Sequence, residues 1–273
     1  MKGVCFSMKP GLLVITHGSR EAGWVALVDE TVEAARAQLG ETLTIEAVFL
    51  ELVEGRLIQD GIDRMLAAGV THLLALPLFV SAGSTHVDEI GWALGAYPEP
   101  KSDTDLERYD TSSLRLTYGE PMDDDPELVD VVLDRLKEMS IQPLRESVLL
   151  VGHGSDRGGF QEAWERGFRS VAEQVLTQGG YGSCSAALLL PNQVDERLNA
   201  IQISHPDHEV LVVGLFLSEG YFTKEVVPRR LRSSDRDSVV KYTGRALMPH
   251  PKVTSWVVRQ ALEWLERSDK DKD

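Results

Sequence analysis

The stretch LLVITHGSR at residues 12–20 has a second copy in this chain, VLLVGHGSD at residues 148–156. Each copy is an apolar run that closes on His-Gly-Ser, and the two histidines, His17 and His153, lie half a chain length apart. The recurrence of one motif at so long a spacing indicates an internal duplication.

A second pair of matching segments supports the duplication. LPLFVSAG at 76–83 is answered by VGLFLSEG at 213–220, at nearly the same spacing as the two histidines. A period of this length is too long for a stacked solenoid and suits two fused domains. We therefore expect an N-terminal domain over residues 1–142 and a C-terminal domain over residues 143–273.

The pattern of apolar residues predicts the fold class. Short runs of Val, Leu, Ile and Ala suit parallel strands that are covered on both faces, and the segments between them have the three-to-four spacing of amphipathic helices. We expect an α/β protein with two tandem doubly wound parallel sheets. The expected strands are 11–16, 43–49, 72–78, 114–117, 147–151, 184–190, 209–217 and 238–242, and the expected helices are 25–39, 56–69, 126–139, 159–177, 193–203 and 252–267.

Composition narrows the functional classes. The net charge of −15 argues against nonspecific binding to nucleic acid or to anionic membranes, since both require excess cationic surface. Only Cys5 and Cys184 are present, and no apolar run is long enough for a signal peptide or a membrane span, so we expect a cytoplasmic protein. The polar stretch 97–113 and the tail 266–273 have the composition of disordered segments.

Three candidate ligands follow three successive predicted strands of the first half. His17 follows the first strand, Glu51 the second, and His86 the third. Loops at the carboxyl ends of parallel strands gather at one edge of the sheet, where ligands bind. Two imidazoles and a carboxylate suit divalent first-row metals, and imidazole can also accept protons near neutral pH.

Each of these residues also has a structural interpretation. The His-Gly-Ser phrase can be a tight turn in which the histidine bonds to backbone, and a structural turn would be duplicated as well. Taken alone, Glu51 is typical of a solvent-exposed acid in a loop, and His86 is typical of a residue at the N-terminus of a helix. The functional interpretation depends on the three side chains converging.

The second half lacks the full set of candidate ligands. Alignment of LFVSAGSTH with LFLSEGYFT places Thr223 opposite His86, and Asn192 or a neighbour takes the place of Glu51. We therefore expect the active site in the first domain and a degenerate site around His153 in the second. The segment KEVVPRRLR at 224–232 is either a solvated helix face or a site for carboxylates, which arginine binds through two donors.

At THGSR, FLEL and PLFVSAGSTH the sequence resembles the class II chelatases, the sirohydrochlorin cobalt- and iron-chelatase family of siroheme and cobalamin synthesis. The resemblance spans essentially the whole chain and implies insertion of Co²⁺ or Fe²⁺ into sirohydrochlorin, with no cofactor beyond that substrate metal. It implies that His17 and His86 hold the metal and accept pyrrole protons, with Glu51 as a further ligand or proton relay.

The same resemblance suggests how the polyacidic tetrapyrrole is bound. It would lie between the two halves of a monomeric, pseudo-dimeric chain. After His86 the chain reads VDEIGWAL instead of the Asp-Ile-Pro-like segment common in the family, so Asp88 and Glu89 are not assigned to the site. The candidate substrate-binding residues are Ser19, Arg20, Gly83, Ser84, Thr85, Arg229 and Arg230.

Two other functions compete with metal insertion. A strand that ends in His-Gly is similar to the nucleophile segment of histidine phosphatases, but Thr16 stands where their phosphate-binding arginine would be. A carrier that binds metal or tetrapyrrole without turnover is the nonenzymatic alternative.

Overall fold

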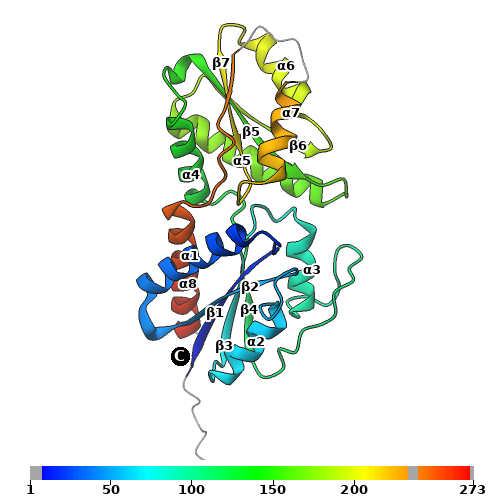
Figure 1. The fold of residues 1–273 in the computed structure, drawn as a ribbon, viewed down its shortest axis with the longest axis vertical. Coiled ribbons are helices and arrows are strands. Elements are labelled where there is room, and N and C mark those ends of the chain that lie inside the picture. Colours follow the sequence, from blue (N-terminus) through cyan, green and yellow to red (C-terminus); the bar gives the residue numbers. More distant parts are fainter. Residues whose placement is uncertain (1–7, 233–238, 271–273) are drawn as a thin grey trace, which may run out of the picture. The chain divides into compact units, whose positions relative to one another are not determined.

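The computed structural model describes residues 8–232 and 239–270, and the first repeat forms a four-stranded parallel sheet in the order β2-β1-β3-β4 (Figure 1). Its strands are β1 Pro10–Thr16, β2 Thr44–Phe49, β3 His72–Pro77 and β4 Arg115–Tyr118. Its helices are α1 Ala22–Leu39, α2 Ile58–Ala67, α3 Thr85–Ala93 and α4 Pro126–Lys137, with a short 3-10 turn at Gly40–Thr42.

The second repeat forms a second parallel sheet in the matching order β6-β5-β7-β8. Its strands are β5 Glu146–Gly154, β6 Ser183–Leu190, β7 Glu209–Gly214 and β8 Val240–Tyr242. Its helices are α5 Phe160–Gly179, α6 Val194–Ser204, α7 Val227–Leu231 and α8 Pro251–Lys270, with a 3-10 turn at Pro143–Arg145 and a π-helical segment at Phe222–Val226. The predicted fold class, two parallel α/β sheets from a duplication, is confirmed.

Strands β1 and β5, which each lie between two other strands of their sheet, are buried along most of their length, as the unbroken apolar runs predict. In β1, residues 11–16 are all buried, and Thr16 pairs in register with Phe49 of β2. In β5, Gly152 pairs with Leu188 of β6 at the corresponding place. Both His-Gly-Ser motifs are therefore held at the carboxyl edge of a rigid sheet.

The chain also divides into two compact units, and this division differs from the division into two repeats. One unit comprises 1–78, 85–121 and 254–273, and the other comprises 79–84 and 122–253. Helix α4 of the first repeat thus belongs to the second unit, and most of α8 belongs to the first. An amphipathic stripe shows that a helix is buried but not which sheet it covers, so the sequence alone did not reveal this exchange.

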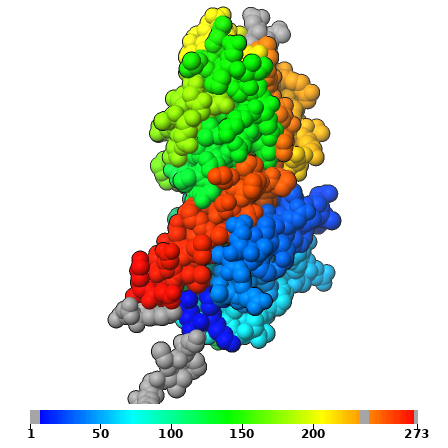
Figure 2. Space-filling model, turned by 90° about the vertical axis from the view of Figure 1, so that its left-hand side faces the viewer, coloured from blue at the N-terminus to red at the C-terminus, as the bar shows by residue number. Residues whose placement is uncertain are grey.

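Helix α8 is attached to the first unit by a specific hydrogen bond. Trp264 Nε1 donates to Thr117 Oγ1 of β4 at 3.1 Å, and Trp264 is almost completely buried. The C-terminal part of α8, red in both views, lies beside the blue helix α1 (Figure 2).

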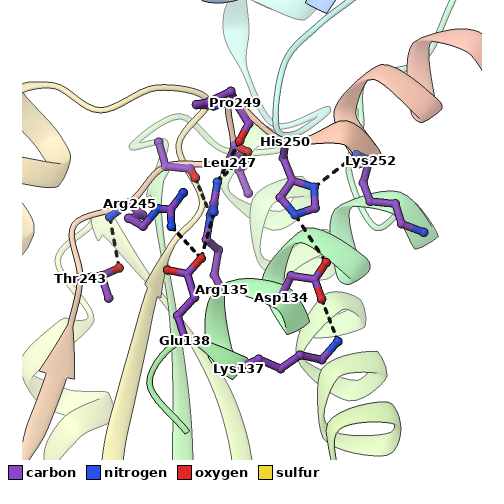
Figure 3. Close-up of polar contacts among 11 residues, drawn as sticks. Asp134, Arg135, Lys137, Glu138, Thr243, Arg245, Leu247, Pro249, His250 and Lys252 are labelled. Carbon is purple, nitrogen blue, oxygen red and sulfur yellow. Dashed lines mark hydrogen bonds and ion pairs between the residues drawn. The ribbon is translucent and has the colours of Figure 1, made fainter.

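Helix α4 is attached to the second unit by Arg135, which is buried. Its Nε donates to the carbonyl of Ala246 at 3.0 Å, and its Nη2 donates to the carbonyl of Pro249 at 3.2 Å (Figure 3). Its Nη1 lies 3.2 Å from a carboxylate oxygen of Glu138. The guanidinium thereby satisfies backbone acceptors of the segment between β8 and α8.

The imidazole of His250 makes the stability of this unit dependent on pH. Burial and the charge of Arg135 lower its pKa, although Asp134, 3.5 Å from Nε2, raises it (Figure 3). The folded protein therefore binds this proton less readily than the unfolded chain. Stability falls as the pH drops below the ordinary histidine pKa of about 6.5.

We expect the free energy of unfolding to depend less steeply on pH in His250→Gln than in the wild type between about pH 7 and pH 5. Urea titrations at a series of pH values measure this slope. Parallel curves for the two proteins would show that His250 does not contribute to it.

The segment 97–113 is ordered, contrary to the expectation from its composition. The backbone N–H of Lys101 donates to Asp88 Oδ2 at 2.7 Å, and that of Tyr109 donates to the carbonyl of Ala93 at 2.9 Å. These bonds attach the segment to α3. The tail expected to be disordered is helical up to Lys270, and residues 271–273 lie outside the described part of the chain, as does Cys5.

Among the described residues, no helix is both long and apolar enough to cross a membrane.

Candidate active site

His17 lies on a turn that only glycine can complete. Gly18 has a φ of +105°, and a Cβ at this position would lie 1.9 Å from the carbonyl oxygen of Glu51. The backbone N–H of Glu51 donates to the carbonyl of His17 at 3.0 Å, and His17 Nδ1 lies 3.2 Å from the Gly18 carbonyl. The turn therefore joins the carboxyl ends of β1 and β2.

The second copy of the motif makes the same turn. Gly154 has a φ of +81°, and a Cβ there would lie 2.2 Å from the carbonyl oxygen of Leu190. His153 Nδ1 lies 3.0 Å from the Gly154 carbonyl. The duplicated phrase is thus explained by turn geometry in both repeats, and the difference between the repeats lies in what surrounds each histidine.

Replacement of Gly18 by alanine is expected to destabilise the first repeat by about 1–3 kcal/mol or more, because a strained φ is combined with a backbone clash. Thermal or urea unfolding measures the change. Gly23→Ala is the matched control, because no atom lies within 4 Å of a Cβ at Gly23. Equal stability of the two variants would contradict the steric argument.

The rings of His17 and His86 meet edge to face. Their centroids are 4.5 Å apart at an interplanar angle of 77°, and the side chains are 39% and 40% exposed. Glu51 Oε1 lies 3.7 Å from His17 Nδ1. The three predicted residues are therefore brought together at the carboxyl edge of the first sheet, within reach of solvent.

A fourth residue, Glu89, was not assigned from the sequence. His86 is in the first turn of α3, and Glu89 lies one turn later on the same face, with Oε1 2.5 Å from His86 Nδ1. Its other oxygen accepts a hydrogen bond from Thr104 Oγ1 at 2.9 Å. The His-x-x-Glu spacing on a helix was the signal that could have identified it.

The surroundings of Glu89 favour its ionised form. Burial alone raises the pKa of this carboxyl group, but hydrogen bonds from His86 and Thr104 outweigh burial and hold the pKa below its ordinary value. Burial and the nearby Glu89 raise the pKa of Tyr109 to about 12. An ionised Glu89 can only accept, so His86 Nδ1 donates and Nε2 is directed away from it.

The arrangement is best described as two histidine–carboxylate pairs whose rings touch. Within the described ranges 8–232 and 239–270, no three His, Cys, Asp or Glu side chains are grouped closely enough to form a ready metal site. In each pair the carboxylate faces Nδ1 of its imidazole. A carboxylate on one ring nitrogen orients the ring and raises the basicity of the other nitrogen, which suits both metal binding and proton transfer.

The residue beside His153 in the second repeat is not the one that the sequence alignment placed there. Phe222, not Thr223, meets the ring of His153, with centroids 4.9 Å apart at 78°. Thr223, in the same π-helical segment, is buried and accepts a hydrogen bond from the backbone N–H of Gly220 at 2.9 Å.

The counterpart of Glu51 in the second repeat also differs from the expectation. Leu190 pairs with Gly154 in the strand register and approaches this glycine as Glu51 approaches Gly18. The expected residue, Asn192, lies further along the loop. The residues at the positions of His86 and Glu51 are thus Phe222 and Leu190, both apolar, and a degenerate second site stays a prediction.

The predicted substrate-binding residues are divided between the two compact units. Ser19, Arg20 and Thr85 belong to the unit that contains the histidine pair; Ser19 Oγ accepts from the Glu21 N–H at 3.0 Å, and Arg20 is exposed. Gly83 and Ser84 belong to the other unit, as do Arg229 and Arg230 of α7.

Gly83 has a packing role within its unit. It is buried, and a Cβ there would lie 2.4 Å from the Trp164 ring and 2.6 Å from the carbonyl oxygen of Phe160. The missing side chain makes room for α5.

The CbiX family model matches residues 11–139 and again residues 147–263. This chain belongs to the CbiX family. The two matches correspond to the two repeats. A sirohydrochlorin cobaltochelatase of Methanopyrus kandleri is 27% identical over 138 residues, which are 46% of this chain and 94% of that relative. One repeat of this CbiX family member thus covers nearly all of a shorter relative.

Longer relatives align with larger parts of this CbiX chain. A sirohydrochlorin ferrochelatase of Priestia megaterium is 26% identical over 223 residues, covering 79% of this chain and 76% of the relative. That of Bacillus subtilis is 29% identical over 152 residues, and the aligned part spans about half of each, 54% of this chain and 52% of the relative.

Solved structures share the fold. SirB from Bacillus subtilis with Fe³⁺ has a TM-score of 0.75 at 21% identity and covers 96% of this chain and 98% of SirB. A CbiX described as the terminal enzyme for biosynthesis of siroheme in denitrifying bacteria has a TM-score of 0.62 at 16% identity, covering 93% of this chain and 98% of that one.

Proposed function

We propose that this chain is a chelatase that inserts a divalent metal, Co²⁺ or Fe²⁺, into sirohydrochlorin. The observation that carries the proposal is the contact between the rings of His17 and His86, each with a carboxylate beside Nδ1. Membership of the CbiX family and the named activities of the relatives agree with it.

The chemistry required by the reaction matches these groups. The incoming ion must lose water molecules while the macrocycle loses pyrrole N–H protons. Imidazole binds such ions moderately, so it can release them again, and it accepts protons near neutral pH. His17 and His86 would hold the metal and take the protons, and Glu51 would complete the ligand set or pass protons to solvent.

The site requires only local movement to bind the metal. The imidazole nitrogens and Glu51 lie at one sheet edge, and their side chains are between 39% and 52% exposed. Rotation of such exposed side chains is inexpensive, so a hydrated ion can recruit them in turn. The low pKa of Glu89 keeps a negative charge next to the incoming cation.

Substrate binding is assigned by the chemistry of the side chains. We propose that Ser19, Arg20 and Thr85 contact the propionate and acetate groups of the tetrapyrrole, because hydroxyl and guanidinium groups donate to carboxylates. Binding of carboxylate groups by Arg229 and Arg230 stays a prediction. No cofactor beyond the substrate metal is proposed, and a cytoplasmic, monomeric, pseudo-dimeric protein stays a prediction.

The proposal is tested by following the absorbance of sirohydrochlorin with purified protein and Co²⁺, Fe²⁺ or Ni²⁺ in separate reactions. Catalytic turnover with at least one metal, above the rate without protein, is expected. Stoichiometric binding of metal or tetrapyrrole without turnover would contradict the chelatase function and indicate a carrier protein instead.

A further inference from the structure

The segment 97–113 has no equivalent in the described part of the second repeat. Residues 94–114 connect α3 to β4, whereas only residues 232–239 connect α7 to β8. The longer connection folds back on α3 and contributes Thr104 to the side of Glu89 that faces away from His86. The extra residues therefore contribute a side chain, that of Thr104, to the surroundings of the site.

We propose that Glu89 is a positioning residue for His86, held in place by Thr104 of the segment 97–113. This rests on the proposed function, because it assumes that His86 binds the metal. The chain of hydrogen bonds from Thr104 to Glu89 and from Glu89 to His86 fixes the imidazole through Nδ1.

The hydrogen bonds of Thr104 make it suited to this task. Its hydroxyl donates to Glu89 at 2.9 Å and accepts from the N–H of Leu106 at 3.1 Å, so the turn of the segment fixes the hydroxyl as well. Glu89 is 18% exposed. A carboxylate held at both oxygens and mostly shielded from water has little freedom to turn away from the imidazole.

The second repeat supplies an internal comparison. The ring that meets His153 there is Phe222, which has no nitrogen to orient. The acid three residues later, Glu225, is exposed. Among the described residues of the second repeat, the ring beside His153 is not an imidazole and the acid at the position of Glu89 is exposed, which links the buried carboxylate of the first repeat to the imidazole of His86.

Asp88, the neighbour of Glu89, has a different function. It is buried and accepts hydrogen bonds from the Lys101 N–H at 2.7 Å and from Tyr97 Oη at 3.1 Å. Asp88 thus attaches the segment to α3, and Glu89 is left to connect the segment to the histidine.

The test measures Co²⁺ binding by the protein alone, through the visible absorption of the bound ion, together with kcat and KM for Co²⁺ insertion. We expect Glu89→Gln to weaken Co²⁺ binding about 10–100-fold and to raise KM for the metal. Thr104→Val should shift both quantities in the same direction by a smaller factor. Ser112→Ala is the matched control, since Ser112 belongs to the same segment but bonds to Asp110.

Thermal unfolding of each variant separates positioning from folding. Weakened Co²⁺ binding at an unchanged melting temperature supports the proposal, whereas wild-type binding by Glu89→Gln overturns it. If Glu89→Gln does not fold, the Co²⁺ affinity of Thr104→Val decides in the same way. The variant His86→Ala separates the positioning role of Glu89 from the proposed function of the site. Unchanged Co²⁺ binding and activity in this variant would refute the proposed site itself, not only the role of Glu89.

Discussion

Replacement of His17 by alanine is expected to lower kcat/KM for metal insertion into sirohydrochlorin by about 10²–10⁴-fold, the range associated with loss of a positioned proton acceptor. The imidazole touches His86 and faces Glu51, so the substitution removes a ligand and a base at once. The initial rate of the absorbance change at varied Co²⁺ and tetrapyrrole concentrations measures it.

His153→Ala is the matched control for this variant. It removes the same side chain from the same kind of turn, with Nδ1 3.0 Å from the following carbonyl compared with 3.2 Å for His17. Because its neighbours are Phe222 and Leu190, its activity is expected to stay close to that of the wild type. Equal losses in the two variants would mean that the turn, and not the chemistry of His17, explains the effect.

Replacement of Arg135 by methionine is expected to lower the free energy of unfolding by about 3–5 kcal/mol, the range observed when a buried charged group is removed from its partners. The guanidinium donates to the carbonyls of Ala246 and Pro249, and its side chain is 6% exposed. Methionine fills a similar volume but leaves the buried carbonyl of Ala246 without this donor. Urea unfolding monitored by tryptophan fluorescence gives the value.

Arg245→Met is the control for charge. Arg245 bonds to the same Glu138 carboxylate at 2.9 Å, but it is 47% exposed, and exposed ion pairs contribute about 0–1 kcal/mol. A loss in Arg135→Met no larger than in Arg245→Met would show that the backbone acceptors find other donors.

The elements of regular structure were predictable because their signals are local. The apolar run before His17 became β1, and the periodic segment 159–177 became most of α5. Helix α3 was not among the predicted helices. Its sequence, THVDEIGWA, is nine residues long and gives a weak helical pattern, because periodicity is a clear signal only over longer stretches.

The candidate site was partly predictable for the same reason. Residues that follow successive parallel strands must meet at one edge, so the proximity of His17, Glu51 and His86 follows from the fold class. Glu89 was missed because its role depends on burial beneath the segment 97–113. The composition of that segment indicates disorder, but a few hydrogen bonds to α3 were enough to order it.

Two repeats and two parallel sheets follow from the amino-acid pattern alone, and the two His-Gly-Ser phrases also indicate tight turns after His17 and His153. Apolar periodicity and the steric freedom of glycine act within a few residues, so they can be read from the chain. Three further features appear only in the folded protein: the units to which α4 and α8 belong, the contact of Phe222 with His153, and the hydrogen bond of Thr104 to Glu89. These are contacts between residues distant in sequence, and they form only when whole elements pack together.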